Sequence, residues 1–285
     1  MSPADPVVVR IFKQESELEI WKRDRSGRYA LMKTYPMCRW SGKLGPKTRI
    51  GDRQAPEGVY HVSTGMLNPK SQYYLSFNLG YPNKLEAALG YTGEALMVHG
   101  ACSSSGCYAL TDEGVAEIYS VVREALKGGQ TSFQVQAYPF RMTPQNMAKH
   151  RTDPSYAFWQ NLKRGYDLFE VTKLPPQVGY CGKGYLFAAA GTEGLPSDPL
   201  AACPVPLTDP VIASRWERDE QLVESTLADG ATTTAYAYSD GGMHPHFRKL
   251  LERDGPKKLA KKTSLTAVPV SRPDAALADP HKPKK

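Results

Sequence analysis

The residues best suited to chemistry lie between Met97 and Tyr108, where a histidine and a cysteine are joined by a loop of small side chains. Cys107 follows His99 by eight positions, after three serines and a glycine. A thiol is mostly protonated at neutral pH, so it becomes a strong nucleophile only beside a base or a cation. Small residues let a substrate carbonyl reach the sulfur and let backbone N–H groups bind the developing oxyanion. The stretch predicts Cys107 as nucleophile, His99 as base, and a surrounding loop made of Gly100, Ser104, Ser105 and Gly106.

Other interpretations of this loop remain open. Cys102 lies in it too and is a second candidate for the nucleophile, or else it pairs with Cys38 or packs beside the site. A histidine with two cysteines is also part of a zinc site, but zinc takes four ligands and no second C-x-x-C pair is present. We therefore predict no metal and no other cofactor. The serines are either hydrogen-bonding partners of the substrate or ordinary loop residues.

The five cysteines bear on the compartment. An odd number leaves one thiol unpaired where disulfides form, so one catalytic cysteine and two bridges account for all five. Cys181 and Cys203 lie in one loop-rich stretch and are predicted to pair, which would stabilise the fold by about 3 kcal/mol. Five reduced thiols in a cytosolic protein are the alternative. The chain starts without a signal peptide, which leaves open a cytosolic protein or one whose leader is not part of this sequence.

Strands are predicted to position this loop. The first forty residues have the pattern of a meander with strands over 6–13, 17–24 and 28–37, and a loop rich in glycine and proline follows over 41–58. Further strand patterns cover 59–64, 73–78, 95–99 and 133–137. After Cys107 the apolar residues recur at helical spacing, with Thr111 or Asp112 as the cap and Gly128 at the end. Two more helices are predicted to begin at Thr143-Pro144 and Asp153-Pro154.

The charge is concentrated at one end of the chain. The formal net charge is +7, and residues Pro256 to Lys285 hold eight Lys/Arg against two Asp/Glu. The rest of the chain is nearly neutral, which argues against nucleic-acid binding by the folded part because that would need a clustered basic surface. No apolar run approaches the roughly 20 residues of a transmembrane helix. The basic tail is either a solvated segment or a weak attraction for anionic cell-wall polymer or lipid.

The residues His99-Gly100 and Ser104-Ser105-Gly106-Cys107 resemble the signature of the YkuD-type L,D-transpeptidase family, His-Gly followed after a spacer by Ser-x-Gly-Cys. Residues 51–60 resemble the family's strand entry. Residues 35–38, 41–47, 76–83 and 138–142 resemble its YafK-like branch, and the likeness extends over about residues 6–190. It implies an α+β fold with a β-rich catalytic domain over 1–190, in which mixed sheets form a sandwich with added helices. A loop-rich C-terminal extension over 191–254, with a short helix at 209–227, and a disordered basic tail over 255–285 would follow.

The resemblance also implies an activity. Such an enzyme attacks peptidoglycan stem peptides at diaminopimelate through a thioester on the cysteine, in the periplasm of a Gram-negative bacterium. Side chains that could bind the carboxylates of an acidic stem peptide are Arg53, Tyr81, Asn83, Tyr108 and Arg141. Ordinary structural hydrogen bonding is the alternative for each of them. The oligomeric state is not indicated.

Two features depart from most of the family. The spacer after His-Gly is short, and Ala109 stands where an arginine usually follows the nucleophile. Both are typical of the YafK-like branch, which resembles an enzyme that hydrolyses the bond between a lipoprotein and the wall peptide. Hydrolysis of such wall-linked lipoprotein is therefore the close alternative to transpeptidation. A non-catalytic wall-binding module and a cytosolic cysteine hydrolase are the remaining alternatives.

Overall fold

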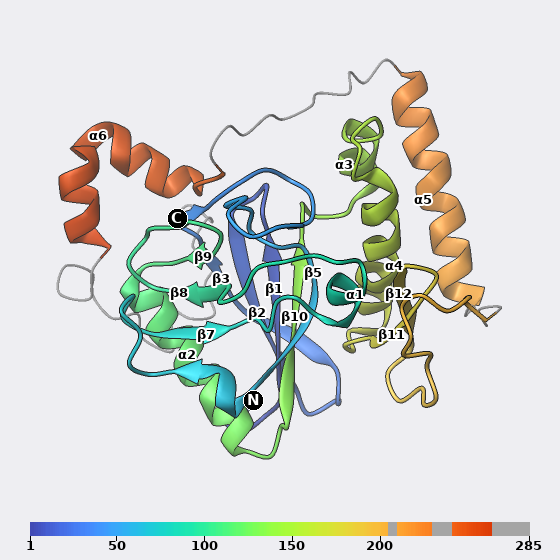
Figure 1. Cartoon of the computed structure of the whole chain (residues 1–285), viewed down its shortest axis with the longest axis horizontal. Coiled ribbons are helices and arrows are strands. Elements are labelled where there is room, and N and C mark those ends of the chain that lie inside the picture. The colour runs from blue at the N-terminus through green and yellow to red at the C-terminus, as the bar shows by residue number, and fades with distance from the viewer. Residues whose placement is uncertain (205–209, 230–240, 264–285) are drawn as a thin grey trace.

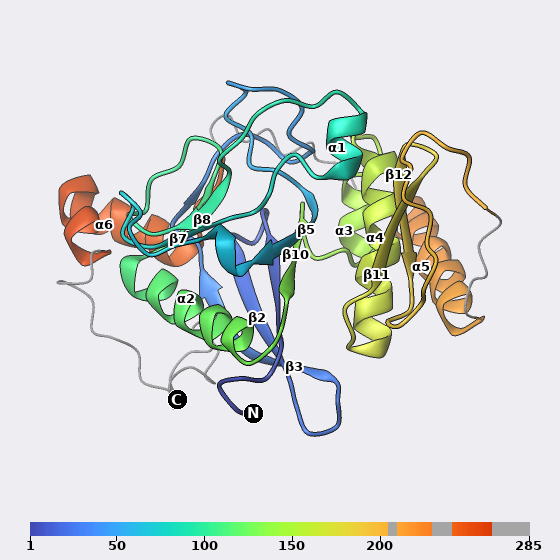
Figure 2. The same ribbon diagram turned by 60° about the horizontal axis from the view of Figure 1, so that its bottom comes forward.

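The sheet at the centre of the molecule is built around its first strand. The computed structural model describes residues 1–204, 210–229 and 241–263. Its larger sheet has the order β3(Tyr29–Pro36), β2(Glu17–Arg23), β1(Val7–Phe12), β10(Ser132–Tyr138), β5(Gly58–Ser63). β1 runs parallel to β10 and antiparallel to β2, so the expected meander β1–β2–β3 is completed by strands from much later in the chain. Figures 1 and 2 show this sheet between two layers of other elements.

β1 is buried on both faces, as its unbroken apolar sequence indicates. Val7, Val9 and Ile11 face a core shared with a second sheet and with α2(Asp112–Lys127), while Val8 and Phe12 face α4(Tyr156–Thr172). The second sheet has the order β4(Arg39–Trp40), β9(Tyr108–Ala109), β8(Met97–His99), β7(Ser76–Asn78), β6(Leu67–Asn68). The two mixed sheets enclose the main core, which is the sandwich expected of this fold class.

α2 covers one end of this core and begins just after the candidate nucleophile. Thr111 is its cap and accepts a hydrogen bond from the Gly114 N–H at 2.9 Å. The predicted apolar stripe is buried, with Val115, Ile118 and Val122 fully enclosed. Each such side chain stabilises the fold by about 1.5–3 kcal/mol. The helix is therefore a firm support for the loop that precedes it.

The opposite face of the larger sheet is covered by α4, α3(Pro144–Lys149) and the hairpin β11(Gln177–Cys181)–β12(Gly184–Ala188) (Figure 2). Two buried cations stabilise this side. Arg10 pairs with Glu170 at 2.6 Å, and Lys13 pairs with Glu57 at 2.8 Å with neither side chain exposed. Glu57 also accepts from the Trp159 indole at 2.8 Å, so it links the loop over 41–58 to α4. The remaining short elements are η1(Thr64–Met66) and α1(Lys84–Ala88).

The C-terminal part is more ordered than the sequence suggested. Cys181 and Cys203 form the predicted disulfide. α5(Pro210–Ala228), whose bounds are close to those of the helix predicted over 209–227, packs on α3 and α4. α6(Pro245–Lys262) runs through the start of the tail expected to be disordered, so that expectation is wrong for residues 255–262. The chain bends at Gly255, and Leu259 then packs near Cys38 with Phe247. This anchoring contact is not visible in the local composition. Residues 264–285 lie outside the described part of the chain.

No helix in the described ranges is long and apolar enough to span a bilayer.

Candidate active site

The smaller sheet places His99 and the nucleophile loop on one face. β8 and β9 are parallel, with Val98 opposite Tyr108 and His99 opposite Ala109. Residues that lie opposite each other share a face, and successive residues alternate between faces. Val98 and Tyr108 are fully buried in the main core, so His99 and Ala109 face the other way.

Cys107 precedes β9 by one residue and lies beside Met97 of β8. Its sulfur is within 3.9 Å of the Ala95 carbonyl oxygen, and the Met97 N–H donates to it. Continuing the strand register by one residue puts Cys107 opposite Met97, so its side chain and that of His99 lie on the same face, two positions apart along the sheet. The thiol is partly exposed, and Cys107 is the one free cysteine among the residues that the structure describes.

A groove of about 630 Å³ runs along the same region of the sheet. Its wall includes Ala95 and Met97, the two residues that contact the Cys107 sulfur. The other lining residues come mainly from β6, β7 and the loops around them, and they include Met66, Asn68, Ser76, Asn78, Tyr81 and Glu94. An extended polar chain can therefore lie along the sheet with one of its carbonyl groups near the thiol.

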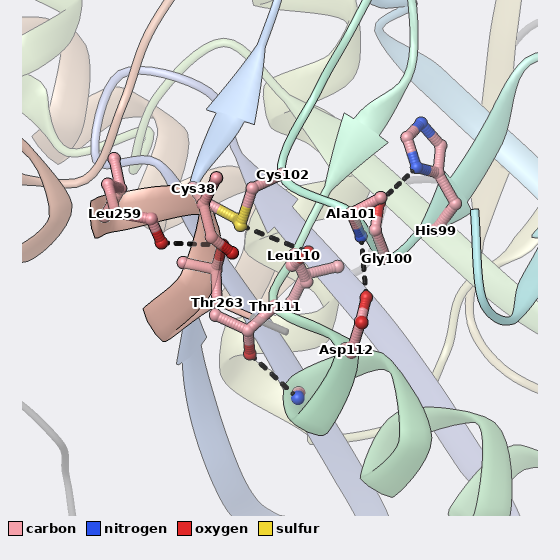
Figure 3. Close-up of a disulfide and its surroundings, with 12 residues drawn as sticks. Cys38, His99, Gly100, Ala101, Cys102, Leu110, Thr111, Asp112, Leu259 and Thr263 are labelled. Carbon is pink, nitrogen blue, oxygen red and sulfur yellow. Dashed lines mark hydrogen bonds between the residues drawn. A yellow bond between two sulfur atoms is a disulfide. The ribbon is translucent and has the colours of Figure 1, made fainter. Parts of the chain in front are cut away.

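The imidazole of His99 is held in a defined orientation. Its Nδ1 lies 2.6 Å from the Gly100 carbonyl oxygen (Figure 3). The ring packs against Tyr73 with the centroids 4.6 Å apart. Since a carbonyl only accepts, Nδ1 carries the proton and Nε2 has the free lone pair. His99 is 2 % exposed, and this burial lowers the pKa of its imidazole. The ring is thus a neutral base at physiological pH.

Burial acts on the thiol in the opposite direction. It raises the pKa of Cys107, and the Met97 N–H and the Lys47 ammonium offset part of that effect. These two directions favour a protonated thiol and a neutral imidazole, so Cys107 would need a base in order to react as a thiolate.

The serines of the loop shape its turn. The Ser104 hydroxyl accepts from the N–H groups of Gly106 and Cys107 at 3.3 and 3.1 Å and donates to the Cys107 carbonyl at 2.7 Å. Gly106 has φ +128°, which favours glycine. Ser105 is exposed beside this turn. The predicted oxyanion donors are thus present, but two of their N–H groups are hydrogen-bonded to Ser104 in this structure.

Cys102 forms a disulfide with Cys38. Of the alternatives left open by the sequence, the structure thus has the pairing of these two residues. In this form Cys102 is neither a nucleophile nor a thiolate ligand for zinc. No group of three or more His, Cys, Asp or Glu side chains suited to a metal occurs among the residues that the structure describes.

Comparison with known proteins agrees with this architecture. The sequence model of the YkuD family, the L,D-transpeptidase catalytic domain, matches residues 6–135, which include His99 and Cys107. The chain is 46% identical over 181 residues to the Escherichia coli K12 protein named "Putative L,D-transpeptidase YafK", covering 64% of this chain and 73% of that protein. This chain is a YkuD-type L,D-transpeptidase family member. Its relationship to YafK places it in the YafK-like branch.

Two solved structures are similar to parts of this chain. The helical cell shape determining protein Pgp2 from Campylobacter jejuni is 17% identical, with a TM-score of 0.39 over 62% of this chain and 73% of that one. Bd1075 from Bdellovibrio bacteriovorus is 16% identical, with a TM-score of 0.34 over 62% of this chain and 78% of that one.

Three of the five residues that were predicted to bind the substrate of this L,D-transpeptidase family member make contacts within the protein. Tyr108 is fully buried and donates to the Pro56 carbonyl, so it cannot touch a substrate. Asn83 caps α1 and donates to the Val59 carbonyl and the Tyr185 hydroxyl. Arg141 pairs with Glu17 and Glu19 at 2.5 and 2.7 Å. The prediction is therefore wrong for Tyr108, while Asn83 and Arg141 are held by partners of the protein itself, as polar side chains near core strands commonly are.

Two of the predicted residues remain near the surface or the groove. Tyr81 lines the groove, although its hydroxyl donates to the Lys47 carbonyl at 3.1 Å. Arg53 is exposed, in a left-handed turn with φ +54°.

The structure also reveals a residue that the family pattern did not indicate. Arg39 of β4 lies opposite Ala109 and therefore shares the face of His99. Ala109 is fully buried and stands between these two positions in the sheet. A short two-residue strand such as β4 leaves no periodic signal by which the sequence could have placed Arg39 here.

Proposed function

We propose that this protein is a peptidoglycan-active cysteine acyltransferase that acts at the diaminopimelate residue of stem peptides through a thioester on Cys107. One observation carries the proposal. His99 and Cys107 share one face of the smaller sheet, and the two residues that contact the sulfur, Ala95 and Met97, line the groove. A wall peptide is an extended, polar chain with free carboxylates, which suits a groove of this kind better than a closed pocket.

The reaction divides into two halves. His99 Nε2 takes the proton of the Cys107 thiol, and the sulfur bonds to the carbonyl carbon of the peptide. The oxyanion forms near the N–H groups of residues 105–107, where it competes with the Ser104 hydroxyl for those of Gly106 and Cys107. The C–N bond breaks, the imidazolium gives its proton to the leaving amine, and an acyl-cysteine remains. An amine or a water molecule then attacks this thioester and regenerates the thiol.

The identity of the second nucleophile separates two candidate functions. An incoming amine gives transpeptidation, and water gives hydrolysis that releases a covalently attached lipoprotein from the wall. The hydrolytic alternative is supported by Ala109, which replaces the arginine usual in the family, and by the short spacer after His99-Gly100. Arg39 supplies a cation on the same face from another strand, and we propose that it binds a carboxylate of the wall peptide in either case.

The cell compartment follows from the same proposal. Two disulfides, Cys38–Cys102 and Cys181–Cys203, suit an oxidising environment, and peptidoglycan lies outside the cytoplasmic membrane. We therefore propose the periplasm as the place of action.

Incubation with purified sacculi tests the proposal. The protein and its Cys107→Ala variant are each incubated with sacculi, with and without attached lipoprotein, and the released fragments and muropeptides are identified by mass spectrometry. New cross-linked dimers would identify a transpeptidase, and released lipoprotein would identify a hydrolase. Sacculi that bind the protein but stay chemically unchanged would mean a wall-binding module and would refute the proposal.

A further inference from the structure

The peptide bond between Gly100 and Ala101 connects His99 to an acidic side chain. Its carbonyl oxygen accepts from His99 Nδ1 at 2.6 Å, and its N–H donates to the Asp112 carboxylate at 2.9 Å. Figure 3 shows the two hydrogen bonds on either side of this peptide, with His99 and Asp112 at the ends. The imidazole and the carboxylate therefore interact with the same delocalised peptide group.

The surrounding structure makes this contact specific. Ala101 has φ +64°, in the left-handed region, and its N–H is directed at Asp112. A side chain at Gly100 would not fit, since an added Cβ would lie 2.6 Å from the Asp112 oxygen and 2.8 Å from the Tyr73 carbonyl oxygen. The Asp112 N–H donates to the Thr263 carbonyl at 3.1 Å. Asp112 does not act as the cap of α2, because Thr111 has that role.

We propose that Asp112 is a positioning residue for His99 and acts through the Gly100–Ala101 peptide. The proposal rests on the proposed role of His99 as the base of Cys107. A carboxylate that accepts from the N–H of a peptide makes the carbonyl of that peptide a stronger acceptor. The Gly100 carbonyl then holds the Nδ1 proton more firmly, fixes the tautomer, and stabilises the imidazolium that forms when the thiol is deprotonated.

The groups around the imidazole determine the direction of the effect. Tyr73 packs on the ring, Cys107 shares its face, and the Lys47 ammonium acts electrostatically on the thiol. Lys47 is positively charged and Asp112 is negatively charged, so it is the charge of Asp112 that favours the protonated imidazole. Neutralising it should lower the pKa of His99 and weaken the imidazolium–thiolate pair.

A purely structural role for Asp112 is tested by its neighbour. Glu113 carries the same charge in the first turn of α2, but it is Asp112 that accepts the hydrogen bond from the Ala101 N–H. An effect that arises only from charge at the helix N-terminus should therefore be equal for Asp112→Asn and Glu113→Gln. Asn at position 112 can still accept from Ala101, so this variant removes the charge and keeps the hydrogen bond.

The experiment measures His99 and Cys107 without a wall substrate. The pKa of His99 is followed by NMR, and the rate of Cys107 alkylation by iodoacetamide is followed against pH, in the wild type, Asp112→Asn, Asp112→Ala and Glu113→Gln. We expect the Asp112→Asn change to lower the pKa of His99 by about half a unit to one unit and to slow alkylation near neutral pH about three- to tenfold, with Asp112→Ala at least as strong. Glu113→Gln should match the wild type.

Two results would overturn the inference. One is an unchanged His99 pKa and alkylation rate in Asp112→Asn, and the other is an equal change in Glu113→Gln. Because alkylation needs no peptidoglycan, inactivity toward sacculi combined with the expected Asp112 effect would refute the proposed function alone. If Asp112→Ala does not fold, the near-isosteric Asp112→Asn variant still decides the question.

Discussion

Removing the disulfide beside the active-site loop should affect both stability and reactivity. Cys102, which lies two residues after Gly100, is joined to Cys38 by a disulfide. Ala101 and Cys102 have left-handed φ values, of +64° and +47° respectively. Such values are uncommon for residues with a side chain and need support from the surrounding structure. Replacing both cysteines by alanine removes the covalent support while keeping the site free of new thiols.

The magnitude follows from the length of chain that each bridge closes. Cys38 and Cys102 are 64 residues apart, which corresponds to about 4.3 kcal/mol in the chain-entropy model. Cys181 and Cys203 are 22 residues apart, which corresponds to about 3.4 kcal/mol. At roughly 2–4 °C per kcal/mol, loss of the first bridge should lower the melting temperature by about 9–17 °C and loss of the second by about 7–14 °C.

The two bridges therefore provide a matched pair. Melting is followed by circular dichroism, and acylation of the folded protein by a carbapenem is followed by intact mass spectrometry at 25 °C. Cys38→Ala/Cys102→Ala should acylate at least about tenfold more slowly, because the peptide that orients His99 loses its support. Cys181→Ala/Cys203→Ala should be destabilised and acylate like the wild type. Equal acylation rates in both double variants would refute the claim that the first bridge positions the site.

Two further predictions concern protonation and the buried ion pair. Burial lowers the pKa of His99, so the acylation rate should rise with pH through a midpoint below the ordinary pKa of histidine and level off near neutrality. A midpoint above about pH 7 in the measured profile would contradict this prediction. Glu57→Gln leaves the buried ammonium of Lys13 without its counter-charge and should cost about 3–5 kcal/mol in chemical denaturation. Glu220→Gln, in a half-exposed pair with Arg151, should change stability by no more than about 0.5 kcal/mol.

Local patterns predicted the elements that carry the site. The helix after Thr111 and the meander over the first forty residues have strong periodicity, and both are present within one or two residues of the expected bounds. The pairing of β1 with β10 joins segments more than a hundred residues apart, so no local pattern indicates it. The likeness to a family supplied the sandwich that periodicity could not.

The candidate site could be predicted only in part, because local patterns indicate residue types but not long-range contacts. His99 and Cys107 stand out because small residues join a possible base to a thiol, and the likeness to the family signature then favours a catalytic pair over a structural one. Asp112 was noted only as a helix cap, since its contact with Ala101 depends on a left-handed turn that the sequence does not show. Tyr108 and Arg141 were expected at the substrate, but their partners, Pro56 and Glu19, are distant in sequence. Polar residues next to strands are ambiguous until the packing around them is known.

The proposed roles of Cys107 and His99 are tested most directly by locating the acyl group after reaction with a carbapenem. The protein is incubated with the reagent, digested, and mapped by mass spectrometry, alongside the Cys107→Ala and His99→Ala variants. We predict one adduct, on the peptide that contains Cys107, no adduct in Cys107→Ala, and formation at least about a hundredfold slower in His99→Ala. An adduct on any other residue, or acylation of His99→Ala at the wild-type rate, would contradict these roles.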